Sequence, residues 1–234
     1  KVIKNTGYGK IDALNAGYEL AKGKYIRFID GDDFLKPEAL SAVKSLDKLK
    51  ADALSSSFKI KVGEIVYPVG SKFLRLNPYS KNKFHSPPRW NWTIRKKCLD
   101  KFFPIPRELP FEDLYIAVNL KFYANKTIAS NLIDYIYVQH PGQTYGGINK
   151  SSRNLVKFRA KRNLVVLKYL EKKFDLPLGI KKVIKEQEQF LDNIFSLKKI
   201  IIDNKFFFNV VFNLKMIVEL VYYNINKNIK IYEA

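Results

Sequence analysis

Hydrophobic and polar positions alternate along the first fifty residues in a regular order of elements. Residues 2–3 read as the end of a strand, and residues 11–22 repeat apolar side chains with helical spacing. Residues 25–29 form a short apolar run that is typical of a buried strand, and residues 38–50 have the pattern of a second helix. This order predicts an α/β layer built on a parallel sheet.

The same kind of pattern continues to residue 138. Strands are expected at residues 53–74, around glycine turns, and at residues 128–138. Helices are expected at residues 93–103 and 111–123. The middle of the chain therefore extends the α/β layer.

The pattern changes after a glycine-rich segment near residue 145, and from there only helices are expected. We therefore divide the chain into an α/β domain over residues 1–150 and a helical C-terminal extension over residues 151–234. Within the extension, residues 206–226 have an apolar and a polar face. Such a helix can dock on a membrane surface or a second subunit, or pack within the molecule, and the sequence leaves these three open.

Composition narrows the class of protein. The chain has 234 residues, of which 47% are hydrophobic, so it can bury a core and is not wholly disordered. Its net charge of +20 suggests an anionic partner, but the charge is spread over both halves rather than gathered in a tail. One cysteine excludes an internal disulfide. Neither a signal peptide nor a convincing membrane span is found, so we expect a cytoplasmic protein, with association at the inner membrane face left open.

The strongest chemical signal is the acidic turn Asp30-Gly-Asp-Asp33, which follows the strand at residues 25–29. Ligands of open α/β sheets bind at the carboxyl ends of strands. Carboxylates are the oxygen ligands that Mg²⁺ and Mn²⁺ prefer, and a metal held there can bind a diphosphate. Taken alone, an acidic turn before a helix is an equally good interpretation.

Three short motifs precede this turn, and they favour a functional site over a plain acidic turn. They are Asn5-Thr-Gly7, Ala13-Leu-Asn-Ala-Gly17 and Ala21-Lys-Gly-Lys-Tyr-Ile26. With the acidic turn they resemble the ordered motifs of family 2 glycosyltransferases of the GT-A fold. The chain departs from that pattern at Leu14, where many members carry arginine.

A second block supports the resemblance further along the chain. Residues 90–96 (Trp-Asn-Trp-Thr-Ile-Arg-Lys) resemble the family's W-N segment, and residues 111–114 (Phe-Glu-Asp-Leu) resemble its E-D motif. Residues 135–140 resemble its closing Y-x-Y strand. The resemblance covers about residues 1–147.

The resemblance implies a GT-A, Rossmann-like mixed sheet flanked by helices. It also implies that the first strand–helix pairs, which normally hold the nucleotide base, are lacking, so that this stretch alone is expected to be inactive. The implied reaction is inverting, metal-dependent transfer of a sugar from a nucleotide-diphospho-sugar, UDP-linked by family habit, to a glycan or lipid-linked acceptor. Synthesis of a bacterial surface polysaccharide is the expected setting.

Roles for individual residues follow from the resemblance. Asp113, with Glu112 beside it, is the expected catalytic base, and Mg²⁺ or Mn²⁺ is the expected cofactor. The remaining site residues are the metal ligands Asp32, Asp33 and His140, the donor-binding Asp30, Lys10 and Asn15, and the acceptor-binding Trp90 and Trp92.

Several of these roles have plainer alternatives. Acidic side chains in a first helical turn, such as Glu112 and Asp113, also stabilise the helix dipole. A single histidine such as His140 is more often solvated than a ligand, and at least one of the two tryptophans is expected in the core.

Two alternatives to an enzyme also remain open. One is a non-catalytic GT-A-like binding or assembly module. The other is a nucleic-acid-binding protein, which the charge would suit. We consider nucleic acid binding the weaker alternative, because the basic residues do not cluster with aromatic residues on a strand face.

Overall fold

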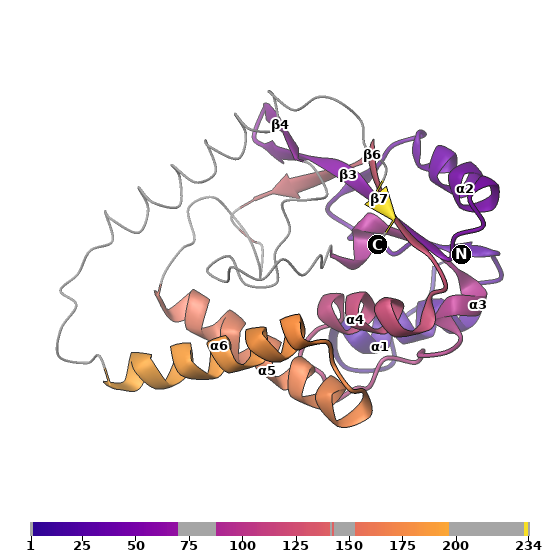
Figure 1. Ribbon diagram of the computed structural model, residues 1–234. Helices are drawn as coiled ribbons and strands as arrows, with labels where there is room; N and C mark the ends of the chain where they lie inside the picture. Colours follow the sequence, from indigo (N-terminus) through magenta and orange to yellow (C-terminus); the bar gives the residue numbers. More distant parts are fainter. Residues whose placement is uncertain (1, 70–87, 141, 143–152, 197–231, 234) are drawn as a thin grey trace. The chain divides into compact units, whose positions relative to one another are not determined.

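The computed structural model describes residues 2–69, 88–140, 142, 153–196 and 232–233 (Figure 1). These residues fall into two compact units, one that contains the sheet with helices α1–α4 and one that contains helices α5 and α6. The fold and the candidate site are described for each unit by itself.

The first unit is an α/β structure in which helices flank a sheet. Its helices are α1 (Gly9–Leu20), α2 (Ala39–Lys48), η2 (Arg89–Asn91), α3 (Lys96–Leu99) and α4 (Asp113–Tyr123). Its strands are β1 (Tyr25–Ile26), β2 (Phe34–Leu35), β3 (Ala53–Val62), β4 (Ile65–Val69), β5 (Trp92–Arg95), β6 (Thr127–Gln139) and β7 (Tyr232–Glu233).

The strand order is β1-β5-β3-β6-β2, with β4 paired to β3 and β7 paired to β6. β5 pairs antiparallel with both β1 and β3, and the pairs β2–β6, β3–β4 and β6–β7 are antiparallel as well. β3 and β6 run in the same direction, because the Asp52 amide meets the Lys126 carbonyl at 2.9 Å and the Ser57 hydroxyl meets the Ser130 carbonyl further along. The expected mixed sheet is therefore confirmed, whereas an all-parallel layer is wrong.

Other departures from the predicted elements are local. A helix was expected at residues 93–103, but the first three of these residues belong to strand β5 and helix α3 covers only the next four. Residues 2–3 are not a strand, and β1 ends after Ile26, three residues before the apolar run ends. Short strand β2 follows the acidic turn, where no strand was predicted.

Two apolar clusters hold the sheet in place. Ala42 and Leu46 of α2 pack on Leu54 of β3 and Ile128 of β6. Ala42 and Leu46 are the buried residues of α2 and lie one helical turn apart, as expected for the apolar face of an amphipathic helix.

The second cluster is aromatic. Trp90 stacks on Tyr135 and Tyr137 of β6, with ring centroids 4.5 and 5.3 Å apart, and meets Phe58 of β3 edge to face at 4.8 Å. Aromatic rings bury large apolar areas, so this cluster fixes the segment before β5 against the sheet.

A buried ion pair connects Arg27, which directly follows β1, to strand β6. The Arg27 guanidinium bonds to both carboxylate oxygens of Asp134 on β6, at 2.8 Å from Nη2 to Oδ1. Ser56 donates a further hydrogen bond to Asp134 at 2.6 Å, and Arg27 Nε donates to the Trp90 carbonyl at 3.0 Å. Because the Asp134 side chain is fully buried, these hydrogen-bond donors replace the water contacts that its carboxylate has lost.

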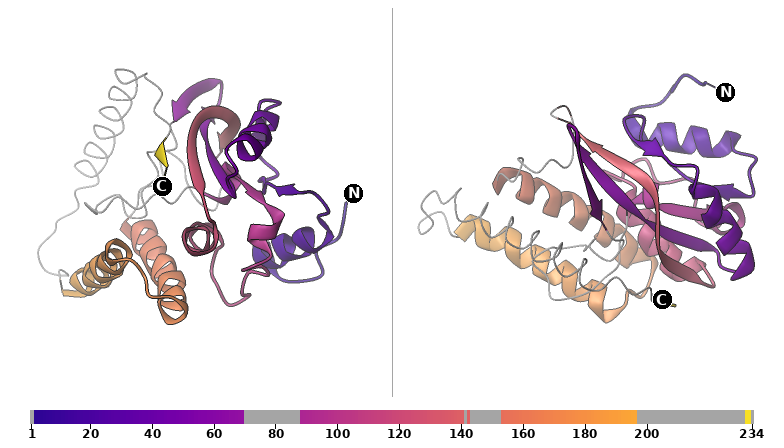
Figure 2. Two further views of the ribbon diagram at one scale, coloured as in Figure 1. Left: turned by 45° about the vertical axis from the view of Figure 1, so that its right-hand side comes forward. Right: turned by 90° about the horizontal axis from the view of Figure 1, so that it is seen from above.

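The second unit contains a pair of helices, α5 (Arg153–Lys173) and α6 (Leu178–Ser196), which lie side by side (Figure 2). Val166, Leu167 and Leu170 of α5 are buried, as are Ile180, Val183 and Ile184 of α6. An ion pair of 2.8 Å joins Lys168 to Glu188 between the two helices.

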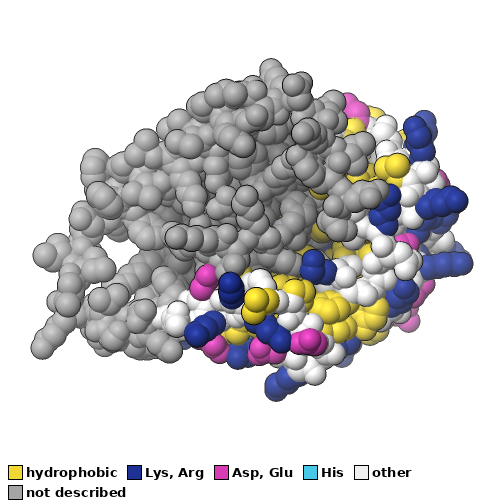
Figure 3. Space-filling model, in the orientation of Figure 1, with side chains coloured by type: hydrophobic (Ala, Val, Ile, Leu, Met, Phe, Trp, Pro, Cys, Tyr) yellow, Lys and Arg dark blue, Asp and Glu magenta, His cyan; other side chains and the backbone are white. Residues whose placement is uncertain are grey.

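None of the helices that the structure describes is both long enough and apolar enough to cross a bilayer. The amphipathic segment at residues 206–226 lies outside the described residues. Lysine and arginine side chains are scattered among acidic and apolar ones on the described face in Figure 3, which agrees with the diffuse charge of the sequence.

We expect Asp134→Asn to destabilise the first unit by about 3–5 kcal/mol, because it leaves the buried Arg27 charge without its partner. Chemical denaturation followed by circular dichroism measures this change. The control is Glu38→Gln, which removes an exposed partner of Lys36 and should leave the midpoint nearly unchanged. Equal midpoints for the two variants would show that the pair contributes no more than a surface contact.

Candidate active site

The acidic turn places its three carboxylates in different surroundings. Asp33 accepts hydrogen bonds from the Tyr135 hydroxyl at 2.7 Å and from the Val138 amide at 2.8 Å, so both of its oxygens are tied to β6. Burial raises the pKa of Asp33, although these two hydrogen bonds oppose the rise. Asp32 is exposed, whereas Asp30 is half-buried.

Arg89 lies at the centre of the site, and sequence reasoning missed it. Its side chain is 2% exposed and contacts three carboxylates. Nη2 bonds to Asp30, and Nη1 lies 3.0 Å from Glu112 Oε1 and 3.7 Å from Asp113 Oδ1. Burial acts to raise the pKa of Asp30, but the hydrogen bond and charge of Arg89, together with Lys10, outweigh it and lower that pKa.

Lys10, in the first turn of α1, supplies the second cation of the site. Its Nζ lies 3.3 Å from Asp30 Oδ1 and 3.2 Å from Glu112 Oε1. Lys10 and Asp30, both expected to bind the donor, therefore lie side by side, and Lys10 also connects Asp30 to the start of α4. Two cations and three carboxylates thus form one charged cluster.

Glu112 and Asp113 are adjacent but differ in access. The Glu112 side chain is 2% exposed and faces Arg89 and Lys10, whereas 35% of the Asp113 side chain is exposed. Asp113 Oδ1 accepts a hydrogen bond of 2.8 Å from the Arg89 amide. Within the described residues, Asp113 Oδ2 has no hydrogen bond or ion pair, so only one of the two oxygens is anchored by the protein.

Burial of its carboxylate among the surrounding groups raises the pKa of Asp113 to about 6, and the charge of Glu112 adds to the rise. Arg89 and Lys10 oppose it. A carboxylate with such a pKa is ionised at neutral pH and still basic enough to accept a proton.

The Glu112 and Asp113 side chains do not take the positions expected of residues that only stabilise the helix dipole. Glu112 is the N-cap residue of α4, yet its side chain makes no capping hydrogen bond. Asp113 is turned toward the amide of Arg89 rather than toward the first turn of its own helix. Both acidic groups therefore serve the charged cluster, whatever they add to helix stability.

Asn15 has a structural position in place of the expected donor-binding one. Its side-chain amide donates to the Ile105 carbonyl at 2.8 Å and accepts from the Ile105 amide at 2.8 Å. This pair of hydrogen bonds joins α1 to the loop before α4, so the polar atoms of Asn15 are already occupied.

The expected acceptor residues lie in the interior. Trp90 and Trp92 are 6% and 4% exposed, and Trp90 is stacked within the aromatic cluster. Neither ring presents a face on which a sugar could stack, so this prediction is wrong. His140 is exposed and belongs to the second unit, so it is not placed relative to the acidic turn.

Among the residues that the structure describes, no group of three His, Cys, Asp or Glu side chains is placed to hold a metal ion. Asp33 is tied to β6, and Asp30 is held by Arg89 and Lys10. The acidic turn therefore offers Asp32 as its exposed carboxylate. This arrangement fits a metal ion only if a ligand such as a diphosphate supplies most of the oxygens.

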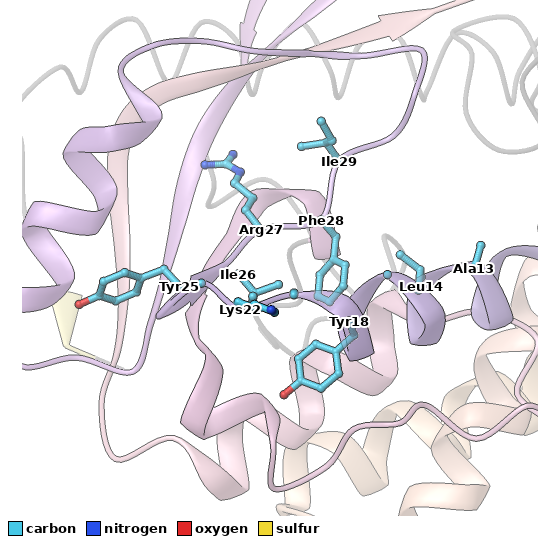
Figure 4. A pocket seen from close by; sticks show the side chains of 12 residues that line it. Ala13, Leu14, Tyr18, Lys22, Tyr25, Ile26, Arg27, Phe28 and Ile29 are labelled. Carbon is cyan, nitrogen blue, oxygen red and sulfur yellow. The ribbon is translucent and has the colours of Figure 1, made fainter. Parts of the chain in front are cut away.

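A shallow hollow of about 440 Å³ lies between α1 and the strand that leads to the acidic turn (Figure 4). Its lining is mostly apolar and includes Leu14, Tyr18, Ile26 and Phe28. No acidic side chain lines it, so this hollow is separate from the charged cluster.

Comparison with known proteins agrees with the motifs. A family model described as Glycosyl transferase family 2 matches residues 1–103. The match includes the acidic turn, Lys10 and Arg89 but ends before Glu112, so the assignment of Glu112 and Asp113 depends on the geometry given above. A comparison with curated proteins found no match.

Among solved structures, the chain is similar to Staphylococcus aureus TarS, residues 1–349, in complex with UDP-GlcNAc. The sequence identity is 20% and the TM-score 0.49, and the similarity covers 80% of this chain and 55% of that one. The chain thus spans about half the length of that structure. From the family match, residues 1–103 belong to glycosyl transferase family 2.

Proposed function

We propose that the protein catalyses inverting transfer of a sugar from a nucleotide-diphospho-sugar, with Asp113 as the general base. The observation that carries this proposal is the contrast between its two carboxylate oxygens. Oδ1 is anchored by the Arg89 amide at 2.8 Å, whereas Oδ2 has no hydrogen bond or ion pair among the described residues, in a side chain that is 35% exposed. Glu112 is too buried to reach an acceptor directly.

In the proposed reaction an acceptor hydroxyl approaches Asp113 Oδ2. The acceptor oxygen forms a bond to the anomeric carbon of the donor while its proton passes to Oδ2. The bond between the anomeric carbon and the diphosphate oxygen breaks at the same time, and its electron pair leaves with the nucleoside diphosphate. A single displacement of this kind inverts the anomeric configuration.

The other charged residues of the site support this step. The charge of Glu112 increases the basicity of Asp113, while Arg89 and Lys10 balance the negative charge of the cluster. Asp30, held by both cations, would contact the donor sugar nucleotide. The donor is expected to be UDP-linked and the acceptor a glycan or lipid-linked glycan at the inner membrane face of a bacterium.

Mg²⁺ or Mn²⁺ belongs to this proposal as a cofactor that would neutralise the leaving diphosphate. Asp32 would hold it, since Asp32 is the exposed carboxylate of the turn. Asp33 would act indirectly, by fixing the turn to β6 through Tyr135 and Val138.

We expect Asp113→Asn to lower the transfer rate by at least ~10²-fold, because an amide cannot accept the proton. Radiolabelled sugar transfer by the complete protein measures the rate, and thermal melting checks that the fold is kept. The matched control is Asp100→Asn, at an exposed carboxylate that pairs with Lys96 outside the cluster. Wild-type turnover by Asp113→Asn would remove Asp113 from the mechanism.

The acidic limb of kcat/KM should lie near pH 6, because only the ionised form of Asp113 can act as a base and its pKa is raised to about 6. Glu112→Gln should move this limb to lower pH, since the charge of Glu112 helps to raise that pKa. Initial rates measured between pH 4.5 and 8 give kcat/KM at each pH. Below the limb, kcat/KM should fall roughly tenfold per pH unit. A limb that does not move in Glu112→Gln would contradict the assignment.

Divalent metal should bind tightly only when a nucleoside diphosphate is present, because the protein offers one exposed carboxylate at the turn. Calorimetry of Mn²⁺ binding to the complete protein, with and without UDP, tests this. Asp32→Ala should abolish the UDP-dependent binding. Tight Mn²⁺ binding without UDP, or unchanged binding in Asp32→Ala, would rule out this form of the metal site.

A further inference from the structure

Arg89 connects two parts of the site that are distant in sequence. Its guanidinium contacts Asp30, which follows β1, and also Glu112 and Asp113, which begin α4. Its backbone amide holds Asp113 Oδ1 at 2.8 Å. Arg89 itself begins η2 and leads directly into β5, the strand that pairs with β1.

We infer that Arg89 is a positioning residue, which aligns the base Asp113 with the donor-binding turn through simultaneous contacts to Asp30, Glu112 and Asp113. This inference rests on the proposed function, because it assigns Arg89 a part in the same reaction. Arg89 acts through these carboxylates and is not required to touch the substrate.

The shape of the guanidinium explains why the position suits arginine. Its two terminal nitrogens diverge, and here Nη2 meets Asp30 while Nη1 meets Glu112 and Asp113. Lysine carries the same charge on a single nitrogen, so at position 89 it could not reproduce two contacts made from separate, diverging nitrogens. Charge and alignment can therefore be separated by comparing the two residues at position 89.

Arg89 also affects the protonation of Asp113 through its charge. The groups that face Asp113 are Glu112 from its own element, Arg89 from η2 and Lys10 from α1. Arg89 and Lys10 favour the ionised form of Asp113, whereas burial and Glu112 disfavour it. Loss of the Arg89 charge should therefore raise the pKa of Asp113 and leave less of the base ionised at neutral pH.

The first experiment does not depend on catalysis. The complete protein is labelled with ¹³C at the aspartate carboxyl carbon, Asp113→Asn identifies the Asp113 signal, and the signal is titrated with pH. The titration midpoint should rise in Arg89→Met and stay nearer the wild-type value in Arg89→Lys. The control Arg95→Met removes an arginine that binds the Ala51 and Leu46 carbonyls instead, and it should leave the midpoint unchanged.

The second experiment measures turnover, with UDP-glucose and UDP-N-acetylglucosamine as donors. Both Arg89→Lys and Arg89→Met should lower kcat by about 10–100-fold with a smaller change in KM, since misplacement of a reacting group by about 1 Å costs that much. Only Arg89→Met should also shift the acidic limb of the pH profile upward. If Arg89→Met does not fold, Arg89→Lys alone still tests the alignment through kcat.

The outcomes separate the two claims. Wild-type kcat and an unshifted Asp113 midpoint in folded Arg89 variants would overturn the positioning role while leaving the proposed function intact. A shifted midpoint in a protein that transfers no sugar from either donor would overturn the proposed function while retaining the charge coupling between Arg89 and Asp113.

Discussion

A buried cation shared by three carboxylates is the interaction on which this site depends. Arg89 is almost fully enclosed, and an arginine in that position requires paired negative charge. Asp30, Glu112 and Asp113 supply it from two separate elements, so the acidic turn and the start of α4 are held at a fixed separation. Lys10 reinforces the same connection from α1.

Excess negative charge is the second property of this cluster. Two cations face three carboxylates, and the least neutralised of these is Asp113, which also has the most exposed side chain. Its raised pKa follows from burial and from Glu112, without any need for a special hydrogen bond. The two adjacent acidic side chains therefore differ in exposure, Glu112 being enclosed in the cluster and Asp113 partly exposed.

Much of the fold and part of the site could be predicted from the sequence. Periodicity located α1, α2, α4 and β6, because each is long enough to repeat its pattern several times. It failed at β5, where four residues are too few to distinguish a strand from a helix.

The motifs drew attention to Asp30, Lys10 and Asp113, which the structure brings into one charged cluster, but they did not indicate the contacts that join these residues. Arg89 was missed because its partners lie 59 and 24 residues away, and no local pattern marks such contacts. Asn15 was assigned to donor binding because it occupies a motif position. In the structure its side chain is instead hydrogen-bonded to the backbone of Ile105.

A crystal structure of the complete protein with UDP bound tests the central claim most directly. The account predicts that the diphosphate lies beside Asp32, that Arg89 still joins Asp30 to Glu112, and that Asp113 Oδ2 faces the space beyond the terminal phosphate where the sugar would lie. UDP bound with its phosphates away from the acidic turn, or with Asp113 turned away from them, would contradict it.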